Sequence, residues 1–169
     1  MYLSMKRGST PIKSGSTLFL KFAVLFIAVI TLIALVYFPT TEGRAKDLDF
    51  IHIYMDPVII YMYIASVPFF LALYQLLKLL GFVDKNKIFS NEAVIAVKSI
   101  KYCALSISVF IVLGLIYIRF FVHGDDPAGP TGLGVVVSFI FIVFATGAAV
   151  FQKILQNAVD IKSENDLTV

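Results

Sequence analysis

Residues 17–38 read TLFLKFAVLFIAVITLIALVYF, an apolar run in which Lys21 is the only charged side chain. An α-helix rises about 1.5 Å per residue, so this run is long enough to cross the roughly 30 Å hydrocarbon core of a bilayer. Lys21 lies one turn inside the run, where its aliphatic stem lets the ammonium group reach the lipid head groups. The stretch therefore predicts a transmembrane helix.

Three further apolar segments of similar length follow, at residues 57–80, 101–121 and 132–151. The loops at 39–56 and 81–100 are too short to bury a core of their own. Of the 169 residues, 59% are hydrophobic and 15% are charged, whereas soluble domains have about a quarter of their residues charged. The sequence predicts an all-α integral membrane protein, a bundle of four helices.

Basic residues are distributed unevenly over the two faces of the membrane that these four spans define. Three of the fourteen Lys and Arg residues, Arg44, Lys46 and Arg119, fall on the face opposite to the chain termini, together with six acids. That face has a net charge of −3, whereas the face with both termini has eleven bases, five acids and a net charge of +6. The positive-inside rule therefore predicts that both termini are cytoplasmic.

The spans divide the chain into three parts. Residues 1–16 are rich in Gly, Pro, Ser and Thr and predict a disordered cytoplasmic tail. Residues 17–158 form the transmembrane domain, and residues 159–169 form a polar cytoplasmic C-terminal tail. Pro39 is expected to end the first span, and Asp56-Pro57 is a typical start for the second, with an N-terminal acid and proline at the first helical position.

The loop between the second and third spans is predicted to contain a short amphipathic cytoplasmic helix that runs into the third span. Ser90 is a favourable N-cap residue, and Glu92 follows in the first turn. Lys98 and Lys101 are expected on a different face from the apolar positions. Those apolar positions recur at helical spacing: Ala93, Val94, Val97, Ile100 and Ala104.

Small and polar residues form narrow stripes on three of the spans, a pattern typical of close contact between membrane helices. Pro68 is additionally expected to kink the second span. The pattern leaves open whether each stripe faces a helix of the same chain or of a second copy in a homo-oligomer. The helix-packing candidates are Gly134, Ser138, Ala145 and Ala149 in the fourth span, Pro68 in the second and Gly114 in the third.

Both histidines are predicted to lie in the outer loops, close to acidic residues. If the two loops meet, imidazole and carboxylate groups could bind a divalent cation or respond to external pH. The spacing matches no specific metal-binding motif, and the sequence favours the simpler interpretation of charged residues on exposed loops, with no metal. The residues concerned are Asp49, His52 and Asp56 in the first loop and His123, Asp125 and Asp126 in the second.

No sequence pattern indicates catalysis, a cofactor or direct nucleic-acid binding. Motifs of membrane enzymes are absent, and the basic residues flank apolar spans instead of forming a stripe on a soluble helix. The central thirds of the spans contain no ionisable side chain of the kind that ion-coupled transporters use. Their polar residues are Thr31, Ser106, Ser108, Ser138 and Thr146. In a channel, Thr31, Ser106, Ser138 and Thr146 would have to converge on a wet cavity.

Four segments together resemble the YoaS-like family of bacterial membrane proteins, a domain of unknown function. They are residues 5–8, 84–90, 98–103 and 152–169, which read MKRG, DKNKIFS, KSIKYC and QKILQNAVDIKSENDLTV. The resemblance implies a four-helix protein of the bacterial cytoplasmic membrane, often encoded beside a small Cro/CI-type helix-turn-helix regulator. It implies no activity and no catalytic residues.

The sequence favours a non-enzymatic sensing or regulatory protein that contacts membrane lipids and a protein partner. The alternative is a small channel, exporter or immunity-type protein, in which the bundle itself acts. Polar cytoplasmic residues that crossing the bilayer does not require are the partner-binding candidates, with ordinary helix capping and topology as their other interpretation. These candidates are Asp84, Lys85, Lys87 and Ser90 in the inner loop and Lys162, Glu164 and Asp166 in the C-terminal tail.

Overall fold

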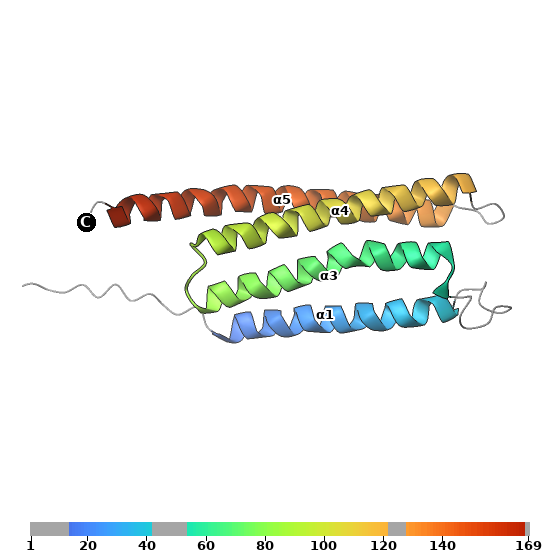
Figure 1. Ribbon diagram of the computed structural model, residues 1–169, viewed down its shortest axis with the longest axis horizontal. Helices are drawn as coiled ribbons and strands as arrows, with labels where there is room; N and C mark the ends of the chain where they lie inside the picture. Colours follow the sequence, from blue (N-terminus) through green and yellow to red (C-terminus); the bar gives the residue numbers. More distant parts are fainter. Residues whose placement is uncertain (1–13, 42–53, 122–127, 168–169) are drawn as a thin grey trace, which may run out of the picture.

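The computed structural model describes residues 14–41, 54–121 and 128–167. Within these ranges the chain forms four long helices, α1 (Ser14–Thr41), α3 (Pro57–Asp84), α4 (Asn91–Phe121) and α5 (Ala128–Leu167). They lie roughly parallel to one another in an elongated bundle (Figure 1). Each is long and apolar enough to cross a membrane, which confirms the predicted all-α architecture with four candidate spans.

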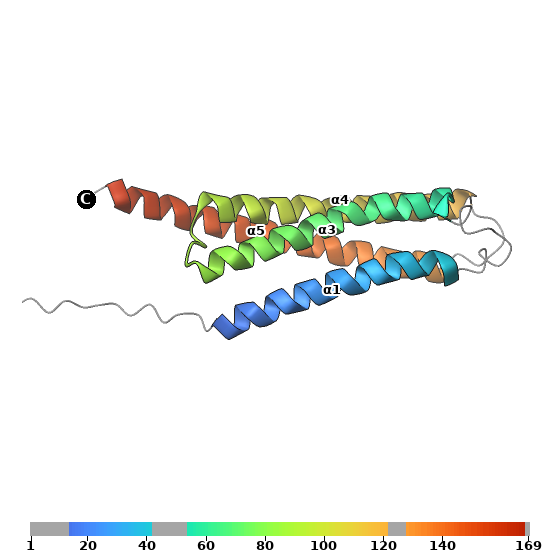
Figure 2. The same ribbon diagram turned by 60° about the horizontal axis from the view of Figure 1, so that its bottom comes forward.

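The helices pack in the order in which they occur along the chain. α3 packs against both α1 and α4, and α4 packs against both α3 and α5. Figures 1 and 2 show the bundle from two directions. The contact between α4 and α5 is the most extensive, and α1 makes most of its contacts with α3. Most apolar side chains of α1 are exposed, as is expected for a helix that faces lipid.

The best-buried cluster of the described chain lies at one end of the bundle, where α3 ends and α4 begins. Ala93, Val94 and Val97 of α4 pack there against Leu155 of α5. Partly buried side chains from α3, the α3–α4 turn and α5 surround them: Leu79, Phe82, Ile88 and Val159. We call this the basic end, because it carries exposed lysines: Lys78, Lys85, Lys87, Lys98, Lys153 and Lys162. The opposite end is called the distal end.

The predicted amphipathic segment is the first part of α4, continuous with the apolar part of that helix. All five of its predicted apolar positions are buried, and Lys98 is exposed. α1 begins at Ser14, inside the predicted tail of residues 1–16, and α5 continues to Leu167 through most of the predicted tail of residues 159–169. The C-terminal segment is therefore helical up to Leu167.

Pro39 lies inside α1, so the prediction that it ends this helix is wrong. Proline has no N–H group, so the Leu35 carbonyl four residues earlier loses its normal intrahelical donor. The Tyr63 hydroxyl from α3 donates a hydrogen bond to this carbonyl at 3.0 Å, and the Tyr54 hydroxyl donates one to the Val36 carbonyl at 3.2 Å. A neighbouring helix thus satisfies the backbone group that proline leaves unpaired, which permits the helix to continue.

Replacing Tyr63 with phenylalanine is expected to destabilise the protein by about 1 kcal/mol, because the Leu35 carbonyl then loses its donor in an apolar environment. Thermal unfolding in detergent measures the change. Tyr74→Phe is the matched control, since Tyr74 is 62% exposed and forms no hydrogen bond within the described chain. Equal melting temperatures for the two variants would contradict this role of Tyr63.

Candidate functional site

The turn between α3 and α4 at the basic end is held by backbone hydrogen bonds that end one helix and by a side chain that starts the next. The Lys87 N–H donates to the Phe82 carbonyl at 2.8 Å, and the Asn86 N–H donates to the Val83 carbonyl at 3.0 Å. This is the Schellman pattern, which requires a left-handed residue, and Asn86 has φ 53°. The turn therefore has a defined geometry.

Ser90 and the two lysines of this turn differ in what they offer to a partner. The Ser90 hydroxyl accepts a hydrogen bond from the Ala93 N–H at 3.4 Å, which confirms Ser90 as the N-cap of α4. Lys85 and Lys87 are exposed. The Ser90 hydroxyl is therefore engaged in capping α4, whereas the ammonium groups of the two lysines take no part in that cap.

Asp84, another partner-binding candidate, forms an ion pair with Lys21 of α1. The side chain of Thr17 contributes a hydrogen bond to the same carboxylate. These contacts join the start of α1 to the end of α3 across 63 residues of sequence. Lys21 and Asp84 therefore link two helices, and the aspartate faces its own chain.

The last turns of α5 extend beyond the rest of the bundle at the basic end (Figure 1). α5 has 40 residues, so it is about 60 Å long, twice the thickness of a hydrocarbon core. Ile161, Lys162 and Glu164 are exposed on this extension. The side chain of Asp166, the remaining candidate, lies outside the part of the structure that is described.

The predicted metal candidates fall almost entirely outside the described ranges. Asp49, His52, His123, Asp125 and Asp126 all belong to segments that the structure does not describe. The sixth candidate, Asp56, is the N-cap of α3, as the Asp56-Pro57 pattern predicted. Its carboxylate accepts a hydrogen bond from the Val58 N–H at 2.7 Å. Within residues 14–41, 54–121 and 128–167, there is no group of three or more His, Cys, Asp or Glu residues that could hold a metal ion.

Two of the helix-packing candidates are glycines that lie against large side chains. Gly114 of α4 faces the Tyr61 ring of α3, and a Cβ atom at Gly114 would lie 3.2 Å from Tyr61 Cε1. The Tyr61 hydroxyl donates a hydrogen bond to the Phe110 carbonyl, one turn away. A Cβ atom at Gly134 of α5 would lie 2.6 Å from a methyl group of Leu115. Both glycines therefore permit close helix contact within one chain.

The other packing candidates lie on the inner side of their helices to different extents. The Ser138 hydroxyl is 2.8 Å from the Ser108 hydroxyl, and both residues are buried between α4 and α5. Ala145 is buried as well, and Ala149 and Pro68 are partly buried. The serine pair satisfies two polar groups in an apolar environment, as interhelical hydrogen bonds in membranes commonly do.

The polar residues that a channel would need do not converge. The Thr31 hydroxyl donates to the Ile27 carbonyl of its own helix, and the Thr146 hydroxyl donates to the Ile142 carbonyl. Thr31 is partly buried and Thr146 is exposed. Ser106 is exposed, whereas Ser138 is buried against Ser108. These side chains do not line a common polar path through the described bundle.

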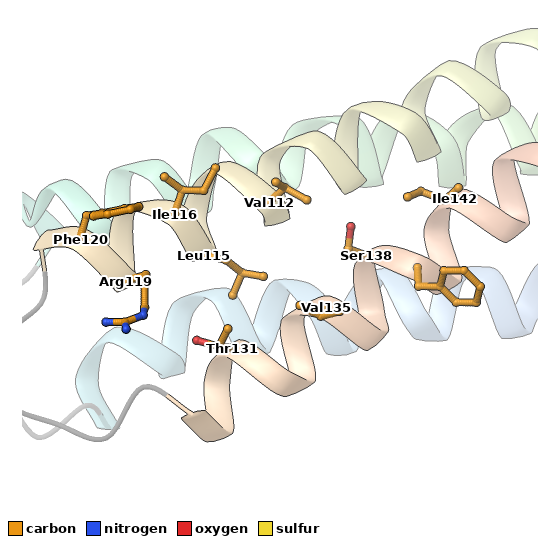
Figure 3. Close-up of a pocket in the computed structure, with 10 residues that line it drawn as sticks. Val112, Leu115, Ile116, Arg119, Phe120, Thr131, Val135, Ser138 and Ile142 are labelled. Carbon is orange, nitrogen blue, oxygen red and sulfur yellow. The ribbon is translucent and has the colours of Figure 1, made fainter.

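An open groove of about 430 Å³ runs between α4 and α5 toward the distal end (Figure 3). It is lined mainly by apolar side chains, with Arg119 and Thr131 at the end nearest the α4–α5 connection. The sequence does not predict this groove. The charge pattern places Arg119 among the basic residues of the outer face and says nothing more about it. The spacing of apolar residues in α4 and α5 does not indicate where these two helices move apart.

The tyrosines that connect helices were likewise not predicted. Tyr61 donates to a carbonyl of α4 and Tyr63 to a carbonyl of α1. A signal was present for Tyr63, because Pro39 frees the Leu35 carbonyl and a donor had to come from elsewhere. The sequence does not say which donor, since that depends on how α1 and α3 are aligned.

Comparison with known proteins finds relatives but no solved structure that matches the chain significantly. The chain is 42% identical to a protein described as uncharacterized membrane protein YoaS of Bacillus subtilis (strain 168), over 91% of this chain and 98% of that protein. A family model described as protein of unknown function DUF2975 matches residues 42–169. This match includes α3, α4 and α5 and leaves out α1. The chain therefore belongs to the DUF2975 family, whose YoaS-like membrane proteins its sequence resembles.

Proposed function

We propose that the protein is a non-enzymatic protein of the bacterial cytoplasmic membrane that binds a cytoplasmic protein partner through its basic end. Both termini are then cytoplasmic, in agreement with eleven of fourteen basic residues on that side. The observation that carries the proposal is the extension of α5, a helix end with an exposed isoleucine that projects past the other helices (Figure 1).

The extension is anchored on the best-buried part of the bundle. Leu155 is 3% exposed and packs against Val94 and Val97 of α4, and Val159 continues this contact one turn further on. Ile161, in contrast, is 60% exposed in the last turns of α5. An apolar side chain on a helix end can act as an anchor when that helix end lies in a groove of another protein.

The charges around the extension suggest the character of the partner. Lys85, Lys87 and Lys162 are exposed at this end, so a partner with an acidic surface would be attracted and oriented by them. A Cro/CI-type helix-turn-helix regulator is the partner class that the family resemblance suggests. Binding would hold such a regulator at the membrane, and the bundle would sense or transmit the signal that releases it.

A channel or exporter has less support, because Thr31 and Thr146 bond to their own helices and Ser108 and Ser138 bond to each other. An enzyme would need an ionisable residue among them, and the central thirds of the spans contain none. The same observations leave the basic end as the part of the described bundle with the largest set of polar groups available to a partner.

Deletion of residues 163–169 is expected to abolish co-purification of the partner while membrane insertion is retained, because it shortens the projecting end of α5 without touching the buried cluster. Crosslinking in native membranes with mass spectrometry identifies the partner. Ile161→Ala is expected to weaken its binding about tenfold, as loss of an apolar interface anchor does.

Ile154→Ala is the matched control for this experiment. Ile154 is also 60% exposed and lies two turns earlier on the same face of α5, next to Leu155 of the buried cluster. It is expected to leave binding unchanged. If the truncated protein inserts and still co-purifies the partner in full, the proposed binding end is wrong.

A further inference from the structure

The groove between α4 and α5 has a polar end and an apolar length. Arg119 and Thr131 lie at the end nearest the α4–α5 connection, and the remaining length is lined mainly by hydrocarbon side chains (Figure 3). The apolar lining comes from both helices: Val112, Leu115 and Ile116 of α4 and Val135, Phe139 and Ile142 of α5. The groove is therefore amphipathic along its axis.

The two polar side chains at this end have groups that the described chain leaves unpaired. The Thr131 hydroxyl is buried and has no hydrogen-bond partner there. Arg119 forms no ion pair with any described residue. A buried hydroxyl without a partner is unfavourable, and a guanidinium group binds phosphate oxygens through several directed hydrogen bonds.

The dimensions of the groove match one leaflet of a bilayer. From Thr131 to Ile142 the axis of α5 rises about 16 Å, and half of a hydrocarbon core is about 15 Å. Ser138, partway along the groove, has its hydroxyl against Ser108, so the deep part presents no free polar group there. A volume of about 430 Å³ lies in the range of sites that bind small ligands.

We infer that this groove binds one anionic phospholipid from the leaflet at the distal end, with its phosphate at Arg119 and Thr131 and one acyl chain along the groove. The guanidinium group of Arg119 would lie at the depth of the lipid head groups, and the apolar walls of the groove at the depth of the acyl chains. A phospholipid has its phosphate and its acyl chains in the same order. An anionic lipid offsets the charge of Arg119, whereas a zwitterionic lipid brings no net charge. The site is separate from the proposed binding end, which lies at the other end of the bundle.

The inference is tested with the full-length protein in nanodiscs that contain equal amounts of phosphatidylglycerol and phosphatidylcholine. Native mass spectrometry of the released protein counts the lipids that remain bound. The wild type is expected to retain one phosphatidylglycerol in preference to phosphatidylcholine. Arg119→Gln is expected to lower this occupancy about tenfold, through loss of a charge-assisted hydrogen bond.

Two adjacent valines of α5 provide a matched pair for the apolar part of the groove. Val135 and Val136 are 57% and 59% exposed, and only Val135 lines the groove. Val135→Phe is expected to reduce lipid retention because the larger ring occupies the path of the acyl chain. Val136→Phe, the same change on the neighbouring surface, is expected to leave retention at the wild-type level.

Three outcomes would overturn the inference. Retention without preference between the two lipids would show that Arg119 does not select an anionic lipid. Unchanged retention in Arg119→Gln would place the bound lipid elsewhere, for example beside the lysines of the basic end. Equal effects of Val135→Phe and Val136→Phe would show that the groove itself holds no acyl chain. Folding of each variant is checked by its melting temperature and elution profile.

Discussion

Val97→Asp is expected to destabilise the fold by about 4 kcal/mol, because it places a carboxyl group in the best-buried cluster of the described chain. Val97 is 2% exposed and packs with Ala93, Val94 and Leu155, which offer no hydrogen-bond donor from their side chains. A carboxyl group there is unpaired whether it is ionised or protonated. The loss should appear as a large drop in melting temperature and as aggregation on size-exclusion chromatography after extraction.

Ile95→Asp is the control for this substitution. Ile95 lies two residues earlier in α4 and is 60% exposed, so the same carboxyl group would remain outside the buried cluster. Its effect is expected to stay within about 1 kcal/mol. A similar loss of stability in both variants would show that the buried cluster at the basic end contributes no more to the stability of the fold than the exposed side of α4 does.

Gly114→Leu is expected to destabilise the protein by about 3 kcal/mol, because the added side chain would occupy the space of the Tyr61 ring. A Cβ atom alone would lie 3.2 Å from Tyr61 Cε1, and a whole isobutyl group has to displace the ring. The Tyr61 hydroxyl would then lose its hydrogen bond to the Phe110 carbonyl. Thermal or denaturant unfolding in detergent measures the loss.

Gly147→Leu is the matched control for the glycine substitution. No atom lies within 4 Å of a Cβ atom built at Gly147, so leucine there is expected to be neutral or slightly stabilising, since glycine is a poor helix former. Tyr61→Ala should reduce the penalty of Gly114→Leu when the two are combined. Additive losses in that double variant would show that the clash is not with Tyr61.

The elements that could be predicted from the sequence are those whose cause is local. Apolar length predicts the spans, Asp56-Pro57 predicts the start of α3, and Ser90 predicts the start of α4. Periodicity places the apolar face of α4 correctly, with Val97 among its buried positions. Each of these features depends on residues within a few turns, so no knowledge of the neighbouring helices is required.

Failures of prediction arise where a distant helix changes the local outcome. Pro39 does not end α1, because Tyr63 of α3 supplies a donor to the Leu35 carbonyl. The ion pair between Asp84 of α3 and Lys21 of α1 was likewise not predicted from the sequence. Such contacts depend on the alignment of helices, and a bilayer-spanning pattern carries almost no information about alignment because every apolar face suits the lipid equally well.

The sequence by itself determined that the protein is a membrane protein with four apolar helices, because crossing hydrocarbon demands length and apolarity that the composition displays directly. It also contained the asymmetry of basic residues from which the orientation is proposed. Only the tertiary structure decided which polar groups pair, where the tight core lies, and that α4 and α5 enclose a groove with Arg119 at its end. These depend on how four similar apolar surfaces fit together, which is a matter of side-chain shape.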